Sequence, residues 1–152
     1  MTENEATENE TPTSERIRWV RYAADCAERV LHLAGPQRPD AEAAIQAARA
    51  WADDPTGERR ETCRETADRA YLGATLTASL SLIFGNRAVK AIQSTAAFSA
   101  ALAAKAAVCG DATTFAAHAV DAAIDAAHDA GSAPGAEQAW QAERRKFYGL
   151  GP

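Results

Sequence analysis

Residues 23–35, AADCAERVLHLAG, contain several side chain types that enzymes use for catalysis. Asp25 and Glu28 are carboxylates suited to general acid–base chemistry. Cys26 followed by His32 has the composition of an activated thiol nucleophile. On a helix, Cys26 falls on the apolar face and His32 on the opposite, polar face, so a Cys–His pair within this segment is excluded by geometry. Asp25 and His32 remain as candidate catalytic residues.

The polar face of this segment also predicts ion pairs. Arg21 and Arg29 each lie four residues from Asp25, and Glu28 lies four residues before His32. Pairs at this spacing stabilise a helix by a few tenths of a kcal/mol each. We therefore expect an exposed, charge-paired face, which would equally suit the binding of another protein through Asp25 and Glu28.

A second polar set follows helical spacing further along the chain. Its members are Asp111, Thr114, His118, Asp121, Asp125 and His128. Imidazole and carboxylate side chains at i,i+3 spacing can hold a transition metal, and His118 with Asp121 could also be joined by His32. The simpler interpretation is a solvated stripe, so we expect neither a metal nor another cofactor. His118 and Asp121 stay as weaker catalytic candidates.

Signatures of common enzyme classes are missing from the sequence. It contains no H-E-x-x-H, Walker loop, G-x-G-x-x-G or G-x-S-x-G motif. Its three cysteines are far apart and form no C-x-x-C pair, which predicts reduced, buried thiols. A non-enzymatic role is therefore favoured, although an enzyme is not excluded.

Aromatic residues near the predicted helix ends form another group of candidates. Tyr22 is expected between the polar and apolar faces of its helix, and Trp140, Phe147 and Tyr148 lie near the C-terminus. Aromatic and arginine side chains are enriched at the energetic centres of protein interfaces. These four residues are candidate contacts for a protein partner.

Composition predicts an all-α fold. Of the residues, 47% are hydrophobic and 24% charged, as in ordinary globular proteins, and alanine, the best helix former, is abundant. Capping residues, glycines and prolines predict about six helices. Their expected ranges are 14–34 with Gly35 as a left-handed cap, a helix capped by Asp40, 57–84 stopped by Gly85 and Asn86, 87–109, 111–130 capped by Asp111, and 134–148 with Pro134 in its first turn.

The helix over 87–109 is apolar or small on every side, which is typical of a buried central helix. We expect one bundle domain over residues 15–148, preceded by a disordered acidic tail over 1–14 and followed by a short end at 149–152. Five of the 21 acidic residues precede the first base, and the rest balance the 16 lysines and arginines. This neutral bundle, without a signal peptide or spanning segment, predicts a cytoplasmic protein that binds neither nucleic acid nor membranes.

Two segments carry a resemblance to a known family. RYAADCAERVLHLAG and, after a proline-bearing loop, DAEAAIQAARAWADD resemble the start of alanine-rich, all-helical immunity proteins of the immunity-5-like class, and WQAERR from Trp140 resembles the closing element of that class. The resemblance spans about residues 16 to 148. It implies a protein that binds and neutralises a cognate toxin of a polymorphic toxin system.

Two alternatives remain open. One is a small all-α enzyme or ligand-binding protein, such as a member of a biosynthetic pathway, that uses Asp25 and His32 or the stripe from His118 to His128; a small-molecule ligand stays open in this alternative. The other is a helical oligomerisation module.

Overall fold

A computed structural model describes residues 14–84, 87–133 and 135–151. This part of the chain folds into six α-helices and two short 3-10 helices. The α-helices are α1 (Ser14–Arg29), α2 (Arg38–Asp53), α3 (Gly57–Phe84), α4 (Arg87–Val108), α5 (Ala112–Asp129) and α6 (Ala136–Phe147), with the 3-10 helices η1 (Leu31–Leu33) and η2 (Gly35–Gln37) between α1 and α2. The predicted all-α bundle is confirmed. The predicted acidic tail, the Gly85–Asn86 stop and the role of Pro134 fall outside the described residues.

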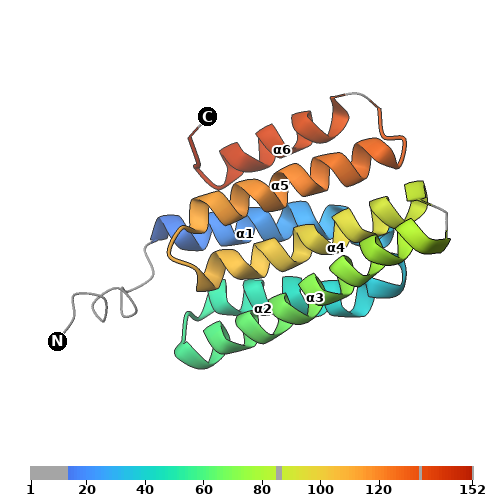
Figure 1. Ribbon diagram of the computed structural model, residues 1–152. Helices are drawn as coiled ribbons and strands as arrows, with labels where there is room; N and C mark the ends of the chain where they lie inside the picture. The colour runs from blue at the N-terminus through green and yellow to red at the C-terminus, as the bar shows by residue number, and fades with distance from the viewer. Residues whose placement is uncertain (1–13, 85–86, 134, 152) are drawn as a thin grey trace.

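Helix α4 occupies the centre, as its sequence predicts. It packs against α1, α2, α3 and α5 (Figure 1). Its contact surface is almost entirely alanine, and the fully buried members include Ala97, Ala100, Ala101, Ala103, Ala104, Ala106 and Ala107. Two buried serines of α4 donate hydrogen bonds to neighbouring helices, Ser94 to the Ala74 carbonyl at 2.9 Å and Ser99 to the Ala119 carbonyl at 2.7 Å.

One helix in the described part of the chain, α4, has the length and apolar composition needed to cross a membrane, over Ala88–Val108. Just over half of that span, 56%, is covered by the rest of the molecule. Its apolar surface is therefore largely accounted for by the packing of the bundle.

The first two helices differ from the sequence-based expectation at their ends. Helix α1 ends at Arg29 instead of continuing to Ala34, because the chain tightens into two 3-10 turns. Gly35 has the predicted left-handed conformation, with φ at 57°. Helix α2 begins at Arg38, so Asp40 lies within the first turn and is not the cap. Proline at position 39 explains the earlier start, since its fixed φ favours the first turn of a helix.

The other predicted boundaries agree closely with the structure. Helix α3 has the predicted range, and α4 ends one residue early. Asp111 caps α5 as predicted, its carboxylate accepting a hydrogen bond from the Thr114 amide at 3.0 Å. Helix α6 lies at one edge of the bundle, beside α5 and opposite α3 (Figure 1).

Candidate functional site

Asp25 is the organising residue of the most highly connected polar cluster. Its side chain is only 11% exposed, although it lies on the polar side of α1. Oδ1 accepts a hydrogen bond from Arg49 of α2 at 2.8 Å, and Oδ2 accepts hydrogen bonds from Arg144 of α6 and from the Tyr148 hydroxyl, both at 2.7 Å. Three elements of the bundle therefore meet at one carboxylate.

The predicted pairs along α1 are wrong. Arg21 pairs with Asp53 at 3.1 Å, and Arg29 pairs with Glu137 at 2.7 Å, so neither binds Asp25. Both arginines instead pair with carboxylates of the neighbouring helices, Asp53 of α2 and Glu137 of α6. Local spacing carries no information about such partners.

Glu28 also differs from its predicted pairing. Its carboxylate forms a two-pronged ion pair with Arg49, with both N–O distances at 2.7 Å, and its predicted partner His32 is exposed on η1. Arg49 therefore bridges Glu28 and Asp25. Its guanidinium holds the pKa of Glu28 below the usual range.

Asp25 is a poor general base. Burial alone would raise its pKa, but the hydrogen bonds from Tyr148, Arg49 and Arg144 outweigh burial and hold the pKa below its ordinary value. On the other side of the bond, burial and the hydrogen bond to Asp25 raise the pKa of Tyr148 to about 12. Asp25 thus remains a carboxylate and Tyr148 a neutral donor across the physiological pH range.

The thiol next to Asp25 is directed into the core, as predicted. Cys26 is fully buried, and burial raises the pKa of its thiol to about 12. Cys63 is likewise buried, with a pKa raised to about 12. Thiols with such pKa values are almost entirely protonated at neutral pH and therefore unreactive as nucleophiles.

The histidine and aspartate stripe of α5 is solvated. His118, Asp121, Asp125 and His128 are all exposed, and His128 approaches Asp129 at 3.5 Å. Within the described residues, no group of three histidine, cysteine, aspartate or glutamate side chains is arranged to hold a metal ion. Nor does His32 join the stripe: it lines a separate groove with Arg29 and Glu137.

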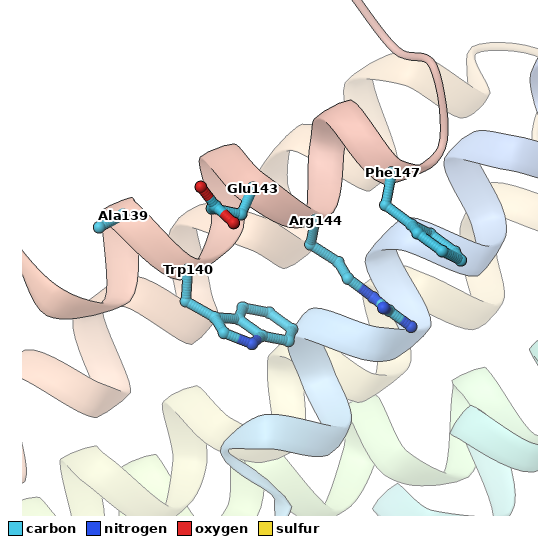
Figure 2. A pocket seen from close by; sticks show the side chains of 5 residues that line it. All are labelled: Ala139, Trp140, Glu143, Arg144 and Phe147. Carbon is cyan, nitrogen blue, oxygen red and sulfur yellow. The ribbon is translucent and has the colours of Figure 1, made fainter.

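Helix α6 presents a continuous arginine and aromatic surface. Figure 2 shows Trp140, Arg144 and Phe147 extending from the same side of α6 toward α1. With Ala139 and Glu143 they line an open groove of about 540 Å³. We call Trp140, Arg144, Phe147 and Tyr148 the α6 face.

The side chains of the α6 face support one another. The Arg144 guanidinium lies 4.5 Å from the centre of the Phe147 ring and 5.4 Å from that of Tyr148. Phe147 and Tyr148 meet edge to face at 5.1 Å. Arg29 of α1 covers the Trp140 ring at 4.5 Å. Cation–π contacts of this kind are worth roughly 0.5–1 kcal/mol at exposed sites.

The four predicted aromatic contacts divide into two groups. Phe147 is 70% exposed, and Trp140 and Tyr148 are half-buried, so all three are accessible. Tyr22 is 3% exposed, and the expectation that it lies at the surface is wrong. Its ring packs edge to face on Trp19 in the core, so it offers little area to a partner.

Sequence reasoning missed Arg49, Arg144 and Glu137 as site residues. One feature of the sequence points to Arg49. It is the one charged residue in the segment AAIQAARAWA, whose other side chains indicate a mostly buried helix. A base in such a segment needs a carboxylate partner. For Glu137 and Arg144, the sequence of α6 gives no comparable signal.

No family model, curated protein or solved structure gives a significant match to this chain.

Proposed function

We propose that this protein is an immunity-type inhibitor that binds a cognate toxin through the α6 face. The observation that carries the proposal is the state of Phe147, a large apolar side chain that is 70% exposed yet held in place by Arg144. Arg144 is in turn fixed by the nearly buried Asp25 at 2.7 Å. This arrangement holds an apolar ring ready for contact.

Preorganisation favours binding. Ordering a flexible side chain on association costs about 0.5–1.5 kcal/mol, and a side chain already fixed in the free protein avoids most of that cost. Tryptophan, tyrosine and arginine are also the residues most often found at interface hot spots. The groove beside Trp140 and Phe147 would receive an apolar side chain of the partner.

The identity of the partner comes from the resemblance to immunity-5-like proteins in RYAADCAERVLHLAG and AIQAARAW. In our proposal Asp25 has a positioning role, because it binds Arg144 and Tyr148 from below the surface of the α6 face. We place the inhibitor in the cytoplasm of the cell that makes the toxin.

Co-expression tests this function. Each toxin-like domain found among the genes adjacent to this one is expressed in a sensitive host with the full chain, and growth is measured. We expect protection by the wild type and by Leu72→Ala, a variant of an exposed residue on α3, but reduced protection by Phe147→Ala. Growth arrest that the wild-type chain does not relieve would contradict the proposal.

A further inference from the structure

The outer face of α3 changes character half-way along the helix. In its first half the exposed side chains are mostly charged: Glu58, Glu61, Arg64, Glu65, Asp68 and Arg69. From position 70 to position 86 the sequence contains no charged residue. The exposed side chains there include Leu72, Leu76, Leu80 and Ile83, which we call the α3 stripe.

Exposed apolar side chains are concentrated at this one place. Seven large ones are at least 43% exposed in the described residues, and six of them lie on α3 or in the first turn of α4: the α3 stripe, Tyr71 and Val89. Together these six expose on the order of 600 Å², which is the upper end of what a monomer leaves in a single patch. Apolar patches of this size are often functional.

We propose that the α3 stripe binds the α3 stripe of a second copy of this chain, with the two helices antiparallel. Outward-facing Leu72, Leu76, Ser79 and Ile83 follow one another at intervals of four, three and four residues, the alternation found in a seam between two packed helices. The small Ser79 near the middle leaves room for a leucine of the other copy.

Charge selects the antiparallel arrangement. In a parallel pair, Glu61 and Glu65 would each face the same residue of the other copy, which is repulsive. In an antiparallel pair the two-fold axis passes between Leu76 and Ser79. The uncharged halves of the two α3 helices then pack on each other, and the charged halves lie far apart. The same patch then serves both copies.

The area is sufficient for a stable dimer. Two stripes with their neighbours would bury about 1,200 Å², which is the lower limit of specific protein–protein interfaces.

Other occupants fit less well. Residues 1–13 contain no large apolar side chain after Met1, so this segment of the chain cannot cover the stripe. Helices that lie on membranes carry lysine and arginine along their polar face, whereas positions 70 to 86 contain neither residue.

Sedimentation and light scattering of the full chain across the micromolar range test the dimer. We expect a mass that approaches twice 16.1 kDa in the wild type and in the control Phe147→Glu. Leu76→Glu buries an unpaired charge in the interface and should weaken association by at least about 100-fold. Leu76 is 54% exposed, so this variant should still fold. A monomeric wild type, or a dimer unaffected by Leu76→Glu, would overturn the proposal.

Crosslinking tests the direction of the helices. Introduced cysteines are compared in a Cys109→Ser background, because Cys26 and Cys63 are buried. A short bis-maleimide should join two copies of Ser79→Cys, near the axis, and not two copies of Glu61→Cys. Efficient joining at position 61 would contradict the antiparallel arrangement.

A vesicle assay addresses the competing occupant. Wild-type monomer that sediments with phosphatidylcholine–phosphatidylglycerol vesicles, and loses this ability on Leu76→Glu, would overturn the proposal and assign the stripe to a membrane. Because helices α3 and α6 lie at opposite edges of the bundle (Figure 1), loss of dimerisation and loss of toxin binding can be told apart.

Discussion

At the scale of single residues, Asp25 connects stability to the proposed binding surface. It accepts hydrogen bonds from Arg49, Arg144 and Tyr148, which lie 24, 119 and 123 residues away in sequence. Asp25 could be singled out from the sequence as an acid inside an alanine-rich segment. Its partners could not, because helical spacing reports only on neighbours within one turn.

Replacing Asp25 by asparagine should destabilise the fold. The amide keeps the shape but loses the charge, which leaves Arg144 without a carboxylate and presents a donor where both oxygens now accept. We expect a loss of about 2–4 kcal/mol in the free energy of unfolding, measured with urea. Asp125→Asn is the matched control, because Asp125 lies on the exposed side of α5. It should change the free energy of unfolding by less than about 0.5 kcal/mol. Equal effects of the two variants would contradict the role of Asp25.

The lowered pKa values of Asp25 and Glu28 predict how stability depends on acid. The unfolded chain takes up protons at these carboxylates before the folded chain does, so their contribution is complete above about pH 5 and is lost as the pH falls below about 4. Unfolding free energies measured from about pH 5 to about pH 3 should decline less steeply in Asp25→Asn than in the wild type. Identical slopes of unfolding free energy against pH would contradict the lowered pKa of Asp25.

At the scale of elements, α6 is attached to the bundle mainly by polar contacts. Glu137, 7% exposed at its side chain, binds Arg29 at 2.7 Å, and Gln141 is buried against the Val120 carbonyl and Glu137. Helix boundaries were largely predictable from caps and glycines, as at Asp111. The start of α2 and the end of α1 were not, because 3-10 turns between them depend on how the two helices pack.

Glu137→Gln should loosen α6 selectively. Without the charge, the hydrogen bond to Arg29 weakens by about 1–1.5 kcal/mol, which corresponds to roughly 10-fold faster amide exchange in α6. Glu143→Gln, on the exposed side of the same helix, is the control. Hydrogen exchange measured by mass spectrometry should show no change in α3 and α4; faster exchange throughout the molecule would contradict a local role.

At the scale of the whole molecule, alanine sets the distance between helices. The buried side of the central α4 consists of small side chains, so its neighbours approach closely and leave no room for larger ones. Ala100→Leu should therefore lower the free energy of unfolding by about 2–3 kcal/mol or prevent folding. Ala117→Leu, on the exposed side of α5, should be nearly neutral. Tolerance of leucine at position 100 would contradict close packing.

The central position of α4 could be predicted from the sequence, because this helix contains few charges on any side.

The central claim is that the α6 face binds a toxin, and it is tested most directly by the affinity for a toxin domain that the co-expression assay identifies. Titration calorimetry would compare the wild type with Phe147→Ala and with Leu72→Ala on the opposite side. We predict that Phe147→Ala weakens binding by about 30-fold, equivalent to about 2 kcal/mol, and that Leu72→Ala changes it by less than about threefold. Unchanged affinity in Phe147→Ala, or a loss as large in Leu72→Ala, would contradict the account.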